Sequence, residues 1–500
     1  MSLSKVNTRA KVGLKAPLVS VEVHLSNGLP AFNIVGLPET AVKESKDRVR
    51  SAILNSKFEF PNRRITVNLA PAELPKGGSR FDLAIAIGIL AASDQVPKQP
   101  LLDYEFIGEL ALSGELRGIE AALPSAMACA EAKKQLIISQ QNASEILLVE
   151  SITILAANNL LEVSAHLFQT QLITPWQKKV PSSVEKYPEL HEVIGQNQAK
   201  RALEIAACGG HHMLLFGPPG TGKSMLASRL TGILPALTKK EALNVACIHS
   251  LSQKDRTENI LQRPFRSPHH SASAIAIVGG GSTPQPGEIS LAHQGILFLD
   301  ELPEFQRSVL EMLREPLESG QIHISRASAQ QSFPAQFQLI AAMNPCPCGY
   351  LGSQRCDCSA EKIARYQNKI SGPILDRIDL HIPVNNIDNR QLIQGKTNHK
   401  ESSNFDIRKR VTKARDLQMQ RQGIVNARLD NQQLKKVCPL NSQLQYFLEK
   451  AINSYSLSAR GYHRLLKVAR SIADLSAIEA PDIAQYQEAL SYRSQFNATK

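Results

Sequence analysis

The sequence predicts an α/β protein that ends in a purely helical segment. Three observations support this prediction. Within the first 170 residues, short β-type apolar runs alternate with stretches of helical periodicity. In the middle of the chain, the apolar run Met213–Phe216 leads through a glycine-rich turn into a helical pattern. From residue 405 onward, the apolar residues repeat with a helical period alone.

The N-terminal segment, residues 1–170, is expected to form a mixed α/β domain. Its predicted helices are Glu39–Asn55, Phe81–Ser93 and Ala121–Lys134. Its predicted strands are Val19–Leu25, Ile65–Leu69, Glu105–Leu112, Leu136–Ile138 and Glu145–Leu148. The polar, proline-flanked stretch 171–190, which holds the single Trp, is predicted to be a linker.

A second α/β domain is expected at residues 191–384, where long insertions separate the β-type runs. An asparagine-rich connection at residues 385–404 leads to the helical segment, residues 405–500. The clearest helices there are Phe405–Gln422 and Arg460–Leu475.

Composition limits the classes of protein to consider. The 500 residues are 43% apolar, which suffices for several buried cores. The longest apolar runs are about half of what a bilayer span needs, and residues 1–5 lack the apolar core of a signal peptide. We therefore expect a cytoplasmic protein with no membrane partner. The eight cysteines do not suggest the disulfide framework of a small secreted domain.

The positive charge is concentrated at the C-terminal end. The formal net charge is +12, and residues 401–500 carry sixteen Lys/Arg against nine Asp/Glu, a net +7. An anionic polymer such as nucleic acid is the natural partner of such a surface. A solvated basic face without a partner is the alternative, so charge alone permits DNA binding without proving it.

A phosphate-binding loop is the clearest motif of the chain. It is Gly217-Pro218-Pro219-Gly220-Thr221-Gly222-Lys223-Ser224, set between a β-type run and a helical pattern. The glycines let backbone N–H groups point at a phosphate, Lys223 supplies a positive charge, and Ser224 offers a hydroxyl to Mg²⁺. A Gly/Pro surface turn would not explain the final Lys-Ser. The motif therefore predicts a nucleotide, expected to be ATP with Mg²⁺.

Two carboxylates follow a second apolar run, Ile296–Leu299. A strand buried in a parallel sheet would deliver Asp300 to Mg²⁺ and Glu301 to the attacking water. The alternative is a core strand that ends at a charged turn. The phosphate loop upstream favours the catalytic interpretation.

Three further polar residues follow in chain order. Asn344 ends another apolar run, Arg377 comes just after a short helical stretch, and Arg460 opens a C-terminal helix. Asn344 is suited to orient the attacking water, Arg377 to reach a phosphate held by a neighbouring subunit, and Arg460 to reach the same phosphates. Taken singly, each has an ordinary polar or ion-paired residue as its alternative.

Together these motifs resemble those of the YifB/ComM proteins, a magnesium-chelatase-like branch of the AAA+ ATPases. The resemblance covers nearly the full length. Besides the phosphate loop, the motifs that show this resemblance are Val35–Pro38, Asn68–Ala72, Arg266–His270, Pro286–His293, Leu299–Phe305 and Arg460–His463. It implies an AAA+ P-loop α/β core and a helical lid of the magnesium-chelatase C-terminal type.

The resemblance also implies residue roles and an assembly. Lys223 and Ser224 would end the Walker A motif, and Asp300 and Glu301 would form the Walker B pair. The remaining roles would be sensor 1 for Asn344, arginine finger for Arg377 and sensor 2 for Arg460. A homo-oligomeric ring, usually a hexamer, would hold ATP at its subunit interfaces.

Members of this family are associated with natural transformation, which implies an ATP-driven helicase or branch-migration motor acting on single-stranded or branched DNA. A chelatase-type or chaperone-type ATPase that remodels a protein partner is the alternative. Members of this family also carry two insertions that face the central pore of the ring. Here they would be Ala272–Ser290 and a hairpin from Ile322 to Phe333, where Arg326 is predicted to contact a DNA phosphate. A structural hairpin with a solvated arginine is the other interpretation. The adjacent His269 and His270 are expected to be structural.

Four cysteines lie within thirteen residues of one another. Cys346, Cys348, Cys356 and Cys358 form two C-x-C pairs that are able to close on one structural Zn²⁺. The one-residue gap is tighter than the usual two. Neutral thiols packed as small apolar residues are the alternative.

The N-terminal domain resembles the proteolytic domain of Lon-type proteases, a fold of the ribosomal S5 domain 2-like class. The motif match places Arg80 where the nucleophilic serine would be and Leu123 where the lysine would be. Neither side chain can act as a nucleophile or its base. An offset match through Ser79 stays open, but an ATP-dependent protease is disfavoured. A role in DNA contact or ring assembly is the more plausible expectation.

Overall fold

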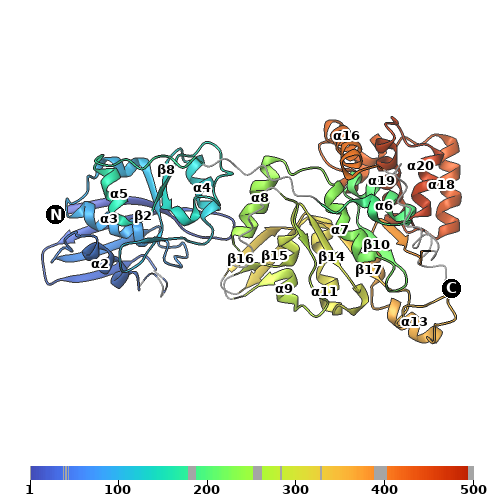
Figure 1. Ribbon diagram of the computed structural model, residues 1–500, viewed down its shortest axis with the longest axis horizontal. Coiled ribbons are helices and arrows are strands. Elements are labelled where there is room, and N and C mark those ends of the chain that lie inside the picture. Colours follow the sequence, from blue (N-terminus) through green and yellow to red (C-terminus); the bar gives the residue numbers. More distant parts are fainter. Residues whose placement is uncertain are drawn as a thin grey trace. The chain divides into compact units, whose positions relative to one another are not determined.

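Contacts divide the chain into two units, which are drawn in Figure 1. The computed structural model describes residues 2–37, 39, 42, 44–177, 187–251, 262–281, 284–326, 329–387 and 402–493, with the backbone alone at residues 325, 326, 329 and 330. The first unit comprises Met1–Ser183 and Lys239–Ile260, and the second comprises Val184–Thr238 and Leu261–Lys500. None of the helices in these described ranges combines the length and apolar character that a membrane crossing requires.

A seven-stranded mixed sheet forms the centre of the first unit, with the strand order β3-β4-β2-β1-β5-β8-β9. Strand β2 is antiparallel to both of its neighbours, and the other pairs are parallel. The strands are β1 (Ser2–Arg9), β2 (Leu18–Ser26), β3 (Ala31–Val35), β4 (Arg64–Ala70), β5 (Tyr104–Ile107), β8 (Gln135–Ser139) and β9 (Ile154–Ala157). Strands β6 (Glu109–Leu110) and β7 (Leu116–Arg117) pair separately.

Helices cover both faces of this sheet. They are α2 (Ser45–Asn55), α3 (Asp82–Ala92), α4 (Ala122–Glu131), α5 (Leu160–Leu167) and α8 (Lys239–Ser250). Helices α2, α3 and α5 share one apolar cluster, and α4 and α8 share another. Strand β8 contributes to both clusters because successive side chains point to opposite faces of the sheet. Ile137 packs in the first cluster, and Leu136 and Ile138 pack in the second. Helix α3 is apolar on all sides and is buried along its whole length.

Two predictions for this unit were incomplete or wrong. The run Glu145–Leu148, predicted as a strand, is a turn in which the Val149 N–H bonds to the Ile146 carbonyl. Strand β1 was not predicted, because small polar side chains occupy positions of its inward face. Ser4, for example, is buried and donates to the Gly88 carbonyl at 2.6 Å. A buried polar residue whose hydroxyl is hydrogen-bonded breaks the alternation of apolar and polar residues by which a strand is recognised in a sequence.

Helix α8 is the main departure from the predicted organisation. Its residues lie inside the range 191–384 expected for the second domain, yet they pack in the first unit against α4. The Cys247 Sγ lies 3.2 Å from the Met127 Sδ, and Lys239 pairs with Glu150 at 2.5 Å. A helical period shows which face of a helix is apolar but does not show which partner covers that face.

The second unit is built on a five-stranded parallel sheet with the order β11-β14-β17-β10-β18. The strands are β10 (Met213–Phe216), β11 (Phe265–Arg266), β14 (Ile296–Leu299), β17 (Gln338–Met343) and β18 (Leu380–Pro383). Strands β14 and β17 are buried at every position. Continuous apolar runs of this kind are typical of parallel strands that are covered on both faces. The predicted α/β fold class is therefore confirmed.

Short helices and two strand pairs fill the connections of this sheet. The helices are α6 (Asn197–Gly209), α7 (Lys223–Ile233), α9 (Ala274–Val278), α10 (Glu288–Leu291), α11 (Arg307–Met312), α12 (Arg314–Ser319), α13 (Ala360–Gln367) and α14 (Gly372–Leu375). The predicted hairpin is formed by β15 (Gln321–Arg326) and β16 (Ala329–Pro334), with Ile322 opposite Phe333. Strands β12 (Gly279–Gly280) and β13 (Gln285–Pro286) form a smaller ribbon within the predicted insertion.

The C-terminal segment is helical, as predicted. Its helices are α16 (Asn404–Gln422), α17 (Asn431–Val437), α18 (Ser442–Tyr455), α19 (Ala459–Leu475) and α20 (Ile483–Ser491). They share one apolar cluster with α6, α7 and the sheet of the second unit. The apolar stripe of α19 is buried in this cluster. The lid is therefore packed onto the core and does not form a separate domain.

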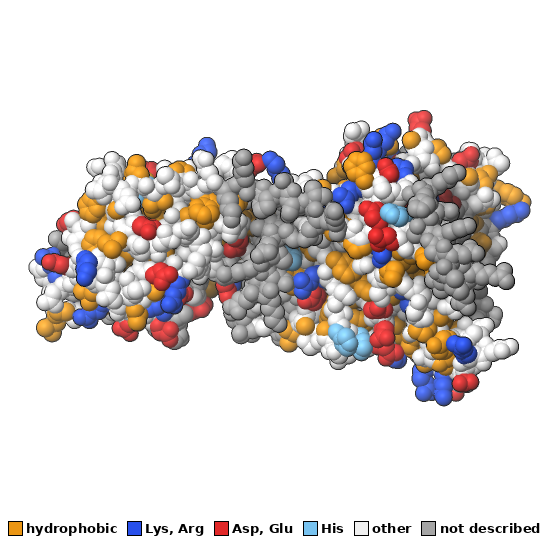
Figure 2. Space-filling model, viewed as in Figure 1, with side chains coloured by type: hydrophobic (Ala, Val, Ile, Leu, Met, Phe, Trp, Pro, Cys, Tyr) orange, Lys and Arg blue, Asp and Glu red, His pale blue; other side chains and the backbone are white. Residues whose placement is uncertain are grey.

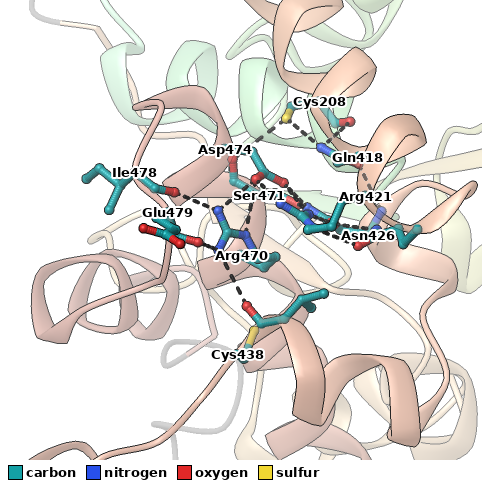
Figure 3. Close-up of polar contacts among 12 residues, drawn as sticks. Cys208, Gln418, Arg421, Asn426, Cys438, Arg470, Ser471, Asp474, Ile478 and Glu479 are labelled. Atoms are coloured by element: carbon teal, nitrogen blue, oxygen red, sulfur yellow. Dashed lines mark hydrogen bonds and ion pairs between the residues drawn. The ribbon is translucent and has the colours of Figure 1, made fainter.

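A buried polar network reinforces this packing (Figure 3). Arg470 is 1% exposed and donates to the Asp474 carboxylate at 2.7 Å and to the Ile478 and Glu479 carbonyls. Asp474 also accepts from Arg421 at 2.7 Å and from Asn426 at 2.8 Å. Burying a charge is costly unless it is paired and hydrogen-bonded, and this carboxylate has three partners.

Several lid arginines therefore have structural partners. Those of α16 contact the Gly232 carbonyl, Glu204, the Ala207 carbonyl and Asp474, through Arg408, Arg410, Arg415 and Arg421 respectively. Figure 2 shows Lys/Arg and Asp/Glu side chains mixed on the visible surface around α16. Much of the C-terminal charge thus stabilises the lid, and most lysines of the described lid are exposed. Exposed examples are Lys409, Lys413, Lys435, Lys436 and Lys450.

Two histidines of the second unit predict an acid-sensitive stability. Burial lowers the pKa of His381 to about 4 and that of His212 to about 4. The unfolded chain binds these protons below pH 6.5, so the free energy of unfolding should fall between pH 6.5 and 4. For buried His381 the loss is up to about 3 kcal/mol. His212 is partly exposed, so its contribution should be smaller.

Urea unfolding at a series of pH values measures this loss. The His212→Asn variant is a matched control, because His212 Nδ1 accepts from the Leu339 N–H at 3.0 Å and the Asn oxygen can replace that acceptor without titrating. It should show a shallower pH dependence. A stability that stays constant from pH 7 to 4.5 would contradict the expectation.

Candidate functional site

Three neighbouring strands bring the predicted nucleotide residues to one edge of the parallel sheet. Strand β10 leads into the phosphate loop, β14 into Asp300 and Glu301, and β17 into Asn344. Because β17 lies between β14 and β10, Asn344 is placed between the carboxylates and the loop. The carboxyl edge of a parallel sheet is where α/β folds bind their ligands.

The polar side chains at this edge contact one another. The Lys223 Nζ donates to the carbonyls of Gly217 at 2.7 Å and Pro218 at 2.8 Å and to the Asn344 Oδ1 at 3.1 Å. The Ser224 Oγ donates to the Asp300 Oδ2 at 2.7 Å. Burial lowers the pKa of Lys223, and the nearby carboxylates of Asp300 and Glu301 oppose this shift. Four residues predicted from three separate motifs thus form one cluster.

The backbone of the phosphate loop requires its glycines. An added Cβ at Gly217 would lie 2.0 Å from the Val384 carbonyl oxygen, so only glycine allows the loop to pass the end of β18. Gly222, with φ +87°, caps α7 in the left-handed conformation. The N–H groups of the first turn of α7 have no acceptor within the helix, and a helix N-terminus of this kind is suited to bind phosphate.

Glu301 has a strained backbone and a partner that the sequence did not predict. Its φ of 52° is unusual for a residue with a side chain and is typical of a functional turn. Its carboxylate lies 3.3 Å from the Nδ1 of His270, which follows β11, the strand beside β14. The sequence interpretation of His269 and His270 as structural therefore missed a contact with the proposed catalytic carboxylate.

An ion pair holds the segment that carries His270. Arg266 donates from Nε to Glu288 at 2.6 Å and from Nη2 at 2.8 Å, which is a bidentate contact. It joins β11 to α10. This ion pair connects two sequence motifs that lie twenty-two positions apart in the chain. The sequence alone did not show this contact.

The two predicted arginines are not part of this cluster. Within the described ranges, neither Arg377 nor Arg460 contacts Lys223, Asp300 or Asn344. Arg377 pairs instead with Glu318, and the Arg460 Nη2 lies 3.7 Å from the same Glu318 oxygen. Arg460 was expected to reach the same phosphates as Arg377; it shares Glu318 with Arg377, and its phosphate contact stays a prediction. The two arginines thus form a second, separate group.

The predicted DNA-contact residue lies only partly within the described structure. The backbone of Arg326 ends strand β15, and its side chain lies outside the described residues. The contact therefore stays a prediction.

The four cysteines converge as a metal site requires. Their Sγ atoms all lie within 4.8 Å of one another, and Cys346 is 3.3 Å from Cys348 and 3.9 Å from Cys356. Tetrahedral zinc thiolates place their sulfurs about 3.8 Å apart, so the donor set fits Zn²⁺. A hydrogen bond from the Tyr350 N–H lowers the pKa of Cys348, which favours a thiolate. The adjoining Gly349 packs against Pro219 of the phosphate loop, 2.7 Å from Pro219 Cδ to an added Cβ.

Zinc removal should therefore affect nucleotide binding. We expect one zinc per chain by elemental analysis, and we expect a strong chelator or Cys356→Ser to weaken ATP binding because the loop loses its support at Pro219. A loss of about 2–3 kcal/mol would lower the Tm by roughly 5–10 °C. The Cys438→Ser variant, at a buried cysteine outside the cluster, should keep its zinc. A chain that folds and binds ATP normally without zinc would contradict the assignment.

The position that corresponds to a protease nucleophile is filled by a buried arginine. Arg80 donates to the Glu120 carbonyl at 2.5 Å and lies 3.4 Å from the Ser125 Oγ. Burial lowers its pKa to about 10. Leu123 is fully buried, and the Ser79 hydroxyl donates to the Glu109 carboxylate. Arg80 thus acts as a structural cation in the core of the first unit.

Comparison with protein families gives matches along most of the chain. A family model described as magnesium chelatase, subunit ChlI, matches residues 189–392, and its C-terminal counterpart matches residues 400–493. A further model, described as subunit ChlI of Mg-chelatase, matches residues 21–142. The last match covers much of the first unit.

Individual relatives are similar over the full length. The competence protein ComM of Haemophilus influenzae is 51% identical over 500 residues, which cover 99% of this chain and 98% of that protein. The uncharacterized protein YifB of Escherichia coli is 48% identical over 499 residues, covering 99% and 97%. The magnesium-chelatase 38 kDa subunit of Cereibacter sphaeroides is 26% identical over 171 residues, covering 31% of this chain and 51% of that protein.

Proposed function

This chain belongs to the magnesium-chelatase-like AAA+ family of ComM and YifB, and from that premise we propose that it is an ATP-driven motor that remodels recombining DNA. Its reaction would be helicase action or branch migration, in the setting of natural transformation. The contacts among Lys223, Ser224, Asp300 and Asn344 support the ATPase activity in this proposal. Full-length similarity to a protein named for competence supports the DNA part.

The residues of the cluster divide the hydrolysis between them. Lys223 binds the β- and γ-phosphates, exchanging its present carbonyl acceptors for phosphate oxygens. Ser224 and Asp300 would hold Mg²⁺, which neutralises charge on the phosphates when it is bound with ATP. Glu301 accepts a proton from the attacking water, and Asn344 orients that water. His270 must release Glu301 for this step, so it is a positioning residue for the base.

Assembly would complete the site. AAA+ proteins form oligomers, and we propose a ring of six in which Arg377 serves the ATP of a neighbouring subunit. The separation of Arg377 and Arg460 from Lys223 supports this arrangement, because neither arginine serves the chain's own phosphate loop in the described structure. Both arginines would then act on the same neighbouring nucleotide.

The proposed DNA surface lies on the lid and on the β15–β16 hairpin. Exposed lysines of the lid and the β15–β16 hairpin, with Arg326 at its tip, are the proposed phosphate contacts. A protein-remodelling ATPase of the chelatase type is the second candidate, favoured by the family models and by the partial match to a chelatase subunit. That match covers only 31% of this chain, whereas ComM is similar over its full length, which supports the DNA motor.

Steady-state ATP hydrolysis with no DNA, with single-stranded DNA and with a mobile four-way junction tests the proposal. Salt is held constant, because phosphate contacts weaken steeply as salt rises. The Lys223→Ala variant supplies the blank. Stimulation by either DNA is the expected result. Equal turnover on all samples would reject the DNA motor and favour the protein-remodelling ATPase.

A further inference from the structure

Two arginines, Arg377 and Arg460, share one carboxylate, Glu318, in the second unit, outside the phosphate-loop cluster. Burial lowers the pKa of Arg377, the Glu318 carboxylate opposes this shift, and the nearby cations Arg460, Arg314 and Arg464 add to it. Arg314 and Arg464 have carboxylates of their own, since they pair with Glu311 at 2.7 Å and with Asp379 at 2.6 Å. Glu318 is left as the shared acceptor of Arg377 and Arg460.

The exposure of the two arginines differs sharply. The Arg377 side chain is only 4% exposed, although a residue that reaches another subunit must be accessible. Its Nη1 donates to the Pro373 carbonyl at 2.6 Å and its Nη2 to Glu318. Its Nε is buried and has no acceptor within the described residues. An unsatisfied buried donor is costly, so this position is not the best that the guanidinium can find once another anion is offered.

The position of Arg460 also suggests that this group of arginines can bind a further anion. Its side chain is 58% exposed, and it lies in the first turn of α19, which begins after the Ser458 cap. A helix dipole disfavours a cation at this end, so no local interaction of the helix explains an arginine there. A phosphate bound beside it would be a closer and more highly charged acceptor for the arginine than Glu318, which lies 3.7 Å away.

We propose that Glu318 is a latch that holds Arg377 and Arg460 in the free subunit and is displaced by the terminal phosphates of ATP bound to a neighbouring subunit. The inference rests on the proposed ring of ATP-binding subunits. A triphosphate carries more negative charge than one carboxylate, and Glu318 is half exposed, so the exchange costs little desolvation of the carboxylate. Arg377 would then leave its buried position only when a neighbour presents ATP. Glu318 is in this sense a positioning residue for the neighbour's reaction.

Arginine labelling tests the latch without relying on activity. Phenylglyoxal modifies accessible guanidinium groups, and mass spectrometry of the peptide that contains Arg377 measures the rate. In dilute, nucleotide-free protein, Glu318→Gln should raise that rate roughly 5-fold. Glu315→Gln is the matched control, because Glu315 is on the same helix, is similarly exposed and faces His323 at 3.8 Å. An unchanged rate for Glu318→Gln would overturn the latch and leave the DNA-motor proposal untouched.

Turnover at low protein concentration tests the consequence. Glu318→Gln should raise ATP hydrolysis per subunit there, while Lys223-dependent ATP binding stays at its wild-type affinity. The rise should disappear when Arg377→Ala is added, because the latch acts through that residue. Lower turnover in Glu318→Gln would instead make Glu318 a support for Arg377 and would reject the latch. A rise that persists with Arg377→Ala would reject it as well.

Folding must be controlled in this experiment. The Tm of each variant is measured, and Glu318→Asp provides a second test that keeps the negative charge. The shorter side chain should hold Arg377 less well, so its labelling rate should lie between those of the wild type and Glu318→Gln. A labelling rate above that of Glu318→Gln would contradict the proposal.

Discussion

The Glu301→Gln variant is expected to bind ATP with wild-type affinity and to hydrolyse it about 10²–10⁴-fold more slowly. The amide keeps the size of the side chain but cannot take the proton of the attacking water. ATP binding depends on the phosphate loop, whose lysine contacts Asn344 and not Glu301. Binding of a fluorescent ATP analogue and release of phosphate measure the two effects separately.

Two further variants serve as controls for this experiment. Lys223→Ala should lose binding and turnover together, because it removes the cation of the loop. Glu304→Gln should retain both, because this half-exposed carboxylate, three positions further along the chain, pairs with Lys369 at 3.2 Å. If Glu301→Gln turned over ATP within about threefold of the wild type, the base would have to be another group.

The Asp474→Ala variant is expected to lower the free energy of unfolding of the second unit by about 3–5 kcal/mol. Asp474 is 3% exposed and is the carboxylate partner of both Arg470 and Arg421. Its removal leaves the guanidinium of Arg470, which is 1% exposed, with carbonyl acceptors alone. Breaking one side of a buried ion pair is costly because the remaining charge stays desolvated.

Urea unfolding, followed by far-UV circular dichroism and by loss of ATP binding, measures this effect. Asp416→Ala on the exposed face of α16 is the control and should change stability by less than about 0.5 kcal/mol. The double variant Asp474→Ala with Arg470→Met should be less destabilised than the sum of the single variants, because the uncompensated charge is gone. Strict additivity would show that the buried pair is not the source of the stability.

Local patterns predicted the parts of the site that a short segment specifies. A buried strand, a glycine turn and the first turn of a helix are consecutive in the chain, so the phosphate loop and the positions of Lys223 and Ser224 could be recognised directly. Asp300 and Asn344 each end an apolar strand, and parallel strands share one carboxyl edge. The contact of Asn344 with Lys223 follows from that geometry.

Residues whose partners come from distant segments could not be predicted in this way. His270 and Glu318 are ordinary polar residues until β11 lies beside β14 and α12 lies near α14. The lid arginines posed the same problem, because net charge counts cations without showing that Arg421 and Arg470 share one buried carboxylate. Pairing of this kind depends on side-chain packing, which has no periodic signal.

Helix α8 has a consequence for the order in which the protein is made. The apolar core between α4 and β8 is completed by Ala246 and Cys247, which leave the ribosome after the entire phosphate loop. The first unit therefore cannot finish folding when its own 183 N-terminal residues have emerged, and it must wait while about sixty more are synthesised. A chain cut at the linker would separate α8 from its partners, exposing apolar surface on both fragments.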